Sequence, residues 1–84
     1  MHVEFLGIPR ERVGVSEVVL DAETLEDVFR TLSARFPSLG GLITAEGLHP
    51  SLAANLNGDH FVRDPRTRLT QSDRLLILSA DAGG

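Results

Sequence analysis

Residues 75–84 read Leu-Leu-Ile-Leu-Ser-Ala-Asp-Ala-Gly-Gly, and this stretch decides the expected fold. Its first four residues form a continuous apolar run, which is typical of a central strand that is covered on both faces or nearly so. After Ser79 only small or polar residues follow, so this part of the chain cannot bury itself. The stretch therefore predicts a last strand at the centre of a sheet and a short flexible tail at residues 81–84.

The clearest helical pattern lies at residues 24–36. Thr24 is a good N-cap residue, and Asp27, three positions later, approximates a capping box. Apolar residues recur at helical spacing through the segment, and Pro37 ends the helix at about Phe36. We expect the helix to share a single core with the first and last strands, built from Leu25, Val28, Phe29, Leu32, Val3, Phe5, Leu75 and Ile77.

The remaining strands are predicted from alternation and turn residues. Alternating residues from Val3 predict a first strand that ends at Pro9, then a turn at 9–12 and a second strand within 13–20, together an opening hairpin. Asn57-Gly58 supplies the positive φ angles of a two-residue turn between strands at 52–56 and 60–63. Three glycines and a proline mark residues 38–50 as a loop, with a short helical or extended piece around 42–45.

This order of elements predicts an α+β fold, in which a mixed sheet carries one main helix packed on one face. The first and last strands can then pair in parallel at the centre of the sheet. The chain is too short for two ordinary domains, so we expect one domain at residues 1–80 and the tail at 81–84.

Composition excludes several classes of function. The net charge of −4 is opposite to that of a nucleic-acid-binding protein, and no apolar run approaches the roughly 20 residues of a membrane-spanning helix. The absence of cysteine removes thiolate ligands and a cysteine nucleophile, and the three histidines lack metal-ligand spacing, so no metal site is predicted. Residues 1–5 do not resemble a secretory signal, which together with the missing cysteines predicts a cytoplasmic protein.

The glycines of the tail carry the chemical hypothesis. Without a Cβ, Gly83 and Gly84 can pass through a narrow channel and approach a nucleotide closely. The Gly84 carboxylate is ionised above a pH of about 4 and is a poor electrophile, so it needs activation. Attack on the α-phosphate of ATP would make an acyl adenylate, from which a sulfur donor would displace AMP to leave a thiocarboxylate. Because the sequence has no Gly-rich loop followed by Lys-Ser or Lys-Thr, a separate enzyme must supply the ATP site.

Two stretches resemble the MoaD/ThiS family of ubiquitin-like sulfur carrier proteins. Residues 3–14, Val-Glu-Phe-Leu-Gly-Ile-Pro-Arg-Glu-Arg-Val-Gly, look like the opening of the molybdopterin synthase small subunit. Residues 69–78, together with Ala-Gly-Gly at 82–84, resemble the closing strand and tail of the wider family. The resemblance implies a β-grasp (ubiquitin-like) fold and C-terminal thiocarboxylation, and its opening favours the molybdopterin type over the shorter thiazole carrier.

The resemblance also implies a substrate protein or noncatalytic subunit rather than an enzyme, with no bound cofactor and with ATP used by the activating enzyme. The implied partners are an adenylyltransferase/sulfurtransferase activating enzyme and a sulfur-accepting synthase subunit, which is the molybdopterin synthase large subunit or one like thiazole synthase. The expected reacting residue is Gly84, and the expected partner-binding residues are Gly83, Ala82, Asp81, Leu78 and Leu6. Core packing is the alternative role of the two leucines.

The same tail would serve other functions. Sulfur carriers for thiazole/thiamine biosynthesis, tRNA thiolation, cysteine synthesis or natural-product biosynthesis are alternatives. So is a ubiquitin-like modifier whose activated Gly84 acyl group is transferred to lysines of other proteins. A third alternative is a β-grasp binding module with an incidental tail.

Overall fold

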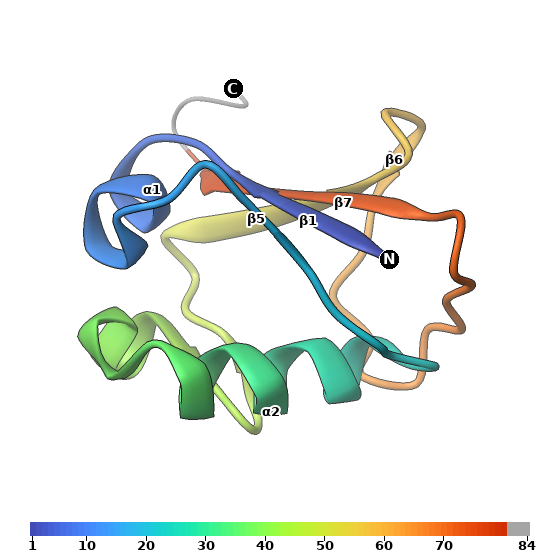
Figure 1. Ribbon diagram of the computed structural model, residues 1–84, viewed down its shortest axis with the longest axis horizontal. Coiled ribbons are helices and arrows are strands. Elements are labelled where there is room, and N and C mark those ends of the chain that lie inside the picture. The colour runs from blue at the N-terminus through green and yellow to red at the C-terminus, as the bar shows by residue number, and fades with distance from the viewer. Residues whose placement is uncertain (81–84) are drawn as a thin grey trace.

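A mixed sheet of five strands forms one layer of the protein, and one long helix packs against it (Figure 1). The computed structural model describes residues 1–80. The strands run in the order β2 (Glu17–Val19), β1 (His2–Phe5), β7 (Arg74–Ser79), β5 (Leu52–Leu56) and β6 (His60–Phe61). β1 and β7 pair in parallel at the centre, which confirms the prediction for the first and last strands, and the other neighbours are antiparallel. The α+β class and β-grasp architecture expected from the sequence are confirmed.

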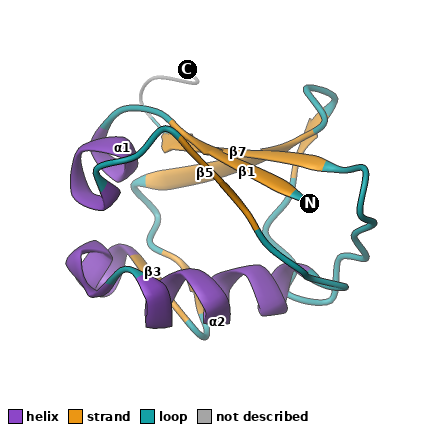
Figure 2. Ribbon diagram, viewed as in Figure 1, coloured by secondary structure: helices purple, strands orange, loops and turns teal. Residues whose placement is uncertain are grey.

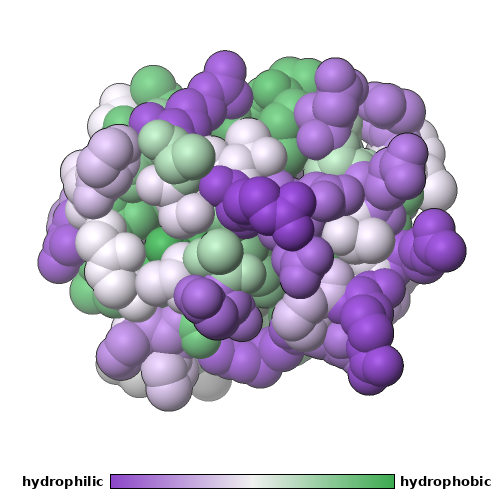
Figure 3. All heavy atoms as spheres, turned by 90° about the horizontal axis from the view of Figure 1, so that it is seen from below, coloured by the Kyte–Doolittle hydropathy of each residue, from purple (hydrophilic) through white to green (hydrophobic). Residues whose placement is uncertain are grey.

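The helix α2 (Leu25–Arg35) begins at the predicted cap. The Thr24 hydroxyl accepts a hydrogen bond from the Asp27 N–H at 3.3 Å, and the Asp27 carboxylate accepts one from the Thr24 N–H at 3.2 Å. Phe36 follows the last helical residue, as Pro37 requires. Hydrophilic side chains spread over the helix side of the molecule, with smaller hydrophobic areas between them (Figure 3). On α2, the exposed side chains of Glu26 and Arg30 form an ion pair at 2.8 Å.

The core lies between α2 and the sheet. All of the predicted core residues are at most 1% exposed, which confirms them as a group. Phe5 and Phe36 meet edge to face, with ring centroids 6.1 Å apart, so the first strand is tied to the C-terminal end of the helix.

The predicted turn after the first strand is wrong, because a short helix, α1 (Ile8–Val13), occupies this position. Pro9 lies in the first turn of α1, where its missing N–H costs no hydrogen bond. Gly14 ends α1 in the left-handed conformation at φ 79°, and its N–H donates to the Arg10 carbonyl at 2.9 Å. The second strand is correspondingly shorter than the 13–20 expected, although β1 and β2 do form the opening antiparallel pair.

The segment expected as a loop at 38–50 is more regular than predicted (Figure 2). A 3-10 helix, η1 (Pro37–Leu42), leads into a small hairpin of β3 (Ile43–Thr44) and β4 (Gly47–Leu48). Leu39 and Ile43 are fully buried, so core packing orders a stretch whose glycines suggested irregular backbone. The regular pieces around 42–45 are therefore the end of η1 and the strand β3.

The positive φ angles predicted for Asn57-Gly58 are confirmed at 58° and 74°, and the Asp59 N–H donates a 3.0 Å hydrogen bond to the Leu56 carbonyl. The turn is one residue longer than predicted, because Leu56 pairs with His60. The strand that follows is β6, which is shorter than the 60–63 expected.

Candidate functional site: the open face of the sheet and the start of the tail

The sheet face opposite α2 is covered by no helix within residues 1–80, and we call it the open face (Figure 1). In β7, Leu75 and Ile77 point into the core, so alternation directs Arg74, Leu76 and Leu78 to the open face. The same alternation directs His2 and Glu4 of β1 there. The apolar run of β7 is thus divided between the core and a surface that a partner can reach.

At one end of the open face lies an apolar group that we call the tail-end patch, consisting of Leu6, Leu78 and Ala53. The Leu6 N–H donates to the Ile77 carbonyl at 2.9 Å, which continues the β1–β7 pairing past Phe5 and brings Leu6 beside Leu78. Ala53 is the partner of Leu78 in the β5–β7 register. Leu6 is 46% exposed and Leu78 is 8% exposed, so Leu6 is the more accessible of the two.

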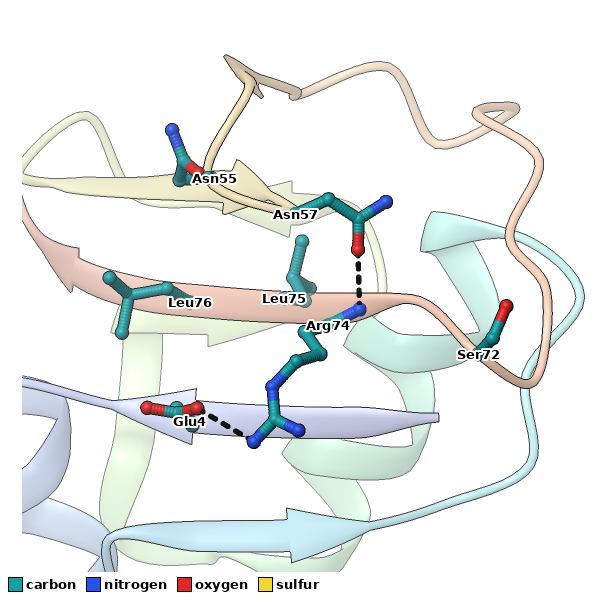
Figure 4. A pocket seen from close by; sticks show the side chains of 8 residues that line it. Glu4, Asn55, Asn57, Ser72, Arg74, Leu75 and Leu76 are labelled. Carbon is teal, nitrogen blue, oxygen red and sulfur yellow. Dashed lines mark hydrogen bonds and ion pairs between the residues drawn. The ribbon is translucent and has the colours of Figure 1, made fainter.

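The opposite end of the open face is charged. The Arg74 guanidinium lies 3.1 Å from Glu4 and 3.0 Å from Glu17, while Nδ1 of His2 lies 3.3 Å from Glu17. A shallow hollow of about 300 Å³ opens beside Arg74, Glu4, Asn55 and Leu76 (Figure 4). The two acidic side chains are therefore compensated by a cation within the protein.

Asp73 and Asn57 fix the start of β7 next to this hollow. The Asn57 side-chain oxygen accepts a hydrogen bond from the Arg74 N–H at 2.8 Å, as Figure 4 shows, and its amide nitrogen donates to Asp73 at 3.0 Å. The Thr70 N–H donates to the other Asp73 oxygen at 2.8 Å. These bonds, first that from Asn57 and then that from Thr70, hold the pKa of Asp73 below its usual value, because they stabilise the ionised carboxylate.

The chain leaves the sheet at the end that carries the tail-end patch. The Ala80 N–H donates to the Ser51 carbonyl at 2.7 Å, and the Ser79 hydroxyl accepts from the Ile8 N–H at 3.4 Å. Gly7 has a φ of 68°, and a Cβ there would lie 3.0 Å from the Ser79 hydroxyl oxygen, so a larger residue at position 7 would press on the end of β7. Ala80 is thus a fixed starting point for the residues that follow it.

Of the predicted site residues, the structure brings Leu6 and Leu78 together on the open face. Gly84, Gly83, Ala82 and Asp81 lie outside the described residues. Within residues 1–80, no group of three or more histidine or acidic side chains could hold a metal ion, and no helix is long and apolar enough to cross a membrane.

Three residues that hold Ala80 or its acceptor escaped the sequence prediction. Ser51 holds Ala80, and His49 and Arg63 hold the segment around Ser51. From the sequence, Arg63 is most simply a solvated charge near a turn, and His49 lacks any metal-ligand pattern. No signal in the sequence indicates the Arg63 contacts or the Ser51–Ala80 hydrogen bond, because they join residues 11 or more positions apart in the chain.

Comparison with known proteins identifies the family. The model of the ThiS family matches residues 3–84, whereas no curated protein matches the chain significantly. Among solved structures, the HVO 2177 protein of Haloferax volcanii is 29% identical, with a TM-score of 0.74 over 99% of this chain and 84% of that one. A chain of the BexX/CysO complex from Amycolatopsis orientalis is 26% identical, with a TM-score of 0.76 over 99% and 98%.

The small archaeal modifier protein 1 from Methanosarcina acetivorans is 24% identical, with a TM-score of 0.77 over 99% of this chain and 94% of that one, and this similarity shows the shared fold. The family match includes the first strand, the last strand and the glycine pair. Because it spans nearly the whole sequence, the protein belongs to the ThiS family of small ubiquitin-like proteins.

Proposed function

We propose that this protein is a sulfur carrier whose Gly84 carboxylate is adenylated by a separate activating enzyme and converted to a thiocarboxylate. The observation that carries the proposal is the family match, which extends through Gly83 and Gly84. The tail-end patch supports it, because an apolar surface beside the start of the tail gives an enzyme a place to dock while the tail enters its active site.

The chemistry follows from the carboxylate. One oxygen of Gly84 attacks the α-phosphorus of ATP, and pyrophosphate leaves with the electrons of the broken P–O bond. Hydrosulfide, as the sulfur donor, then attacks the acyl carbon and loses its proton, and AMP leaves with the electrons of the broken C–O bond, so that one carboxylate oxygen has been replaced by sulfur. The carrier supplies the acyl group and the docking surface, and the enzyme supplies the ATP site.

We further propose that the pathway is molybdenum cofactor biosynthesis, with this chain as the small subunit of molybdopterin synthase. Residues 3–14 support this assignment, because they resemble the opening of that subunit. In this role the chain is a noncatalytic subunit that transfers sulfur to a substrate held by the large subunit. Purified molybdopterin synthase large subunit should therefore bind the carrier and consume the thiocarboxylate, whereas a thiazole synthase should not.

The test is an intact-mass measurement after incubation with activating enzyme, ATP and a sulfur donor. We expect the parent chain to exchange one oxygen for sulfur and a variant lacking Gly84 to exchange none, because the deletion moves the carboxylate back by about 3.5 Å. Misplacement by even about 1 Å can cost roughly 100-fold in rate. A thermal melt of the deletion variant controls for folding. Sulfur gain by the deletion variant at the parent's rate would contradict the proposal, and lysine-linked conjugates in place of a thiocarboxylate would indicate a protein modifier instead.

A further inference from the structure

The Arg63 side chain reaches back over the segment that joins β4 to β5. One terminal nitrogen of its guanidinium donates to the Leu52 carbonyl at 2.9 Å. The other donates to the Leu48 carbonyl at 3.0 Å and to the His49 carbonyl at 3.4 Å. A charged donor strengthens such bonds, and the two nitrogens of the planar guanidinium can bridge carbonyls that a single ammonium cannot reach together. Arg63 therefore holds both ends of residues 48–52.

Ser51 lies inside this segment and contacts Ala80. Its N–H donates to Nδ1 of His49 at 3.1 Å, and its hydroxyl lies 2.9 Å from the same nitrogen. Its carbonyl accepts the 2.7 Å hydrogen bond from the Ala80 N–H. Because Arg63 and His49 both fix the backbone on either side of Ser51, they also fix the acceptor that holds Ala80.

We propose that Arg63 is a positioning residue for the C-terminal tail, acting through the Ser51 carbonyl on Ala80. The inference rests on the proposed function, in which the enzyme must place the Gly84 carboxylate against ATP. Gly84 is four residues beyond Ala80, so the carboxylate can lie at most about 14 Å from this anchor. The hydrogen bond between Ala80 and Ser51 fixes the point from which the tail extends, relative to the tail-end patch. It therefore also fixes that point relative to an enzyme docked on the patch.

Loss of the anchor frees one more residue, which the enzyme must then order. Fixing the backbone of one residue reduces an equilibrium or rate constant by roughly 5- to 30-fold. We expect this loss in the rate of adenylate formation at saturating carrier. The carrier concentration that gives half the maximal rate should stay within about twofold of the parent's value, because the variant keeps Leu6 and the rest of the open face unchanged.

The direct test is the hydrogen exchange of the Ala80 amide, followed by NMR in the parent, in Arg63→Met and in Arg66→Met. Arg66 is the matched control, because its side chain is 91% exposed and pairs only with Asp64 among the described residues. In Arg63→Met the Ala80 amide should exchange at least about 10-fold faster relative to the amides of Leu76 and Ile77, whereas Arg66→Met should leave the ratio unchanged. If Arg63→Met does not fold, His49→Ala removes the acceptor of the Ser51 N–H and is measured in the same way.

Two results would overturn the inference. An unchanged exchange ratio for Ala80 in folded Arg63→Met would show that Arg63 does not hold the anchor. A faster ratio with an unchanged rate of adenylation would show that the anchor does not position the tail. Partial recovery of the Ala80 exchange ratio and of the adenylation rate in Arg63→Lys supports the inference, since the lysine nitrogen can reach only some of the three carbonyls. A parent chain that no activating enzyme adenylates would contradict the proposed function, while the exchange measurement would still test the anchor.

Discussion

Truncation of Leu6 should weaken docking of the activating enzyme without unfolding the carrier. Leu6 is 46% exposed, so about half of its side chain is still available for burial by a partner. Full burial of a leucine is worth about 1.5 to 3 kcal/mol, and half of that corresponds to a roughly 3- to 13-fold increase in the Kd of Leu6→Ala. Leu6→Arg should cost more, because a charge would have to lose water at an apolar contact.

The assay is a titration of the activating enzyme with each carrier variant, paired with a thermal melt. Val19→Ala is the matched control, because Val19 is 61% exposed on the open face but pairs with His2 at the far end from the tail. We expect its Kd to stay within about twofold of the parent's value. An unchanged Kd for both Leu6 variants, in carriers that melt like the parent, would show that the tail-end patch is not the docking surface.

Three further outcomes follow. Phe29→Ala should lower the free energy of unfolding, measured with denaturant, by about 3 to 5 kcal/mol, because Phe29 is fully buried. That is a large share of the roughly 4 to 13 kcal/mol expected for 84 residues. An unchanged denaturation midpoint would contradict the place of Phe29 in the core. Leu78→Arg should lower both the melting temperature and the adenylation rate, because Leu78 is 8% exposed yet lies on the open face; a parent-like melt would mean that the side chain turns outward freely. Hydrogen bonds from Asn57 and Thr70 lower the pKa of Asp73 in the folded state, so its contribution to stability is present above the ordinary aspartate pKa of about 4 and is lost as the pH falls through the lowered folded-state pKa. Across this pH range, the free energy of unfolding of Asp73→Asn should depend less on pH than that of the parent.

The sequence was sufficient for the elements whose signals are local and strong. Thr24 and Asp27 cap α2 as expected, because a capping box involves only neighbouring residues. The Asn57-Gly58 turn was equally predictable, because few residues adopt a positive φ readily. The apolar run of β7 indicated a central strand, and that is its position in the sheet.

The elements that the sequence missed depend on tertiary contacts. α1 spans only residues 8–13, too few for a clear helical period, and its second residue is a proline that also fits a turn. The order at 37–48 comes from burial of Leu39 and Ile43, which no local pattern distinguishes from a loop. Leu6 and Leu78 were predicted from family resemblance, whereas Arg63 was not, because its partners are backbone carbonyls that carry no side-chain signature.

The parallel pairing of β1 and β7 has a consequence for how the chain folds. His2 lies opposite Arg74, so the central contact of the sheet joins residues more than 70 positions apart and must close almost the whole chain as a loop. Such non-local contacts form late and slowly compared with a helix or a hairpin. A nascent chain that has not yet reached residue 74 leaves β1 and β5 without their shared neighbour, each with an unpaired edge. During synthesis, therefore, the sheet is completed only when the strand that leads into the tail has been made.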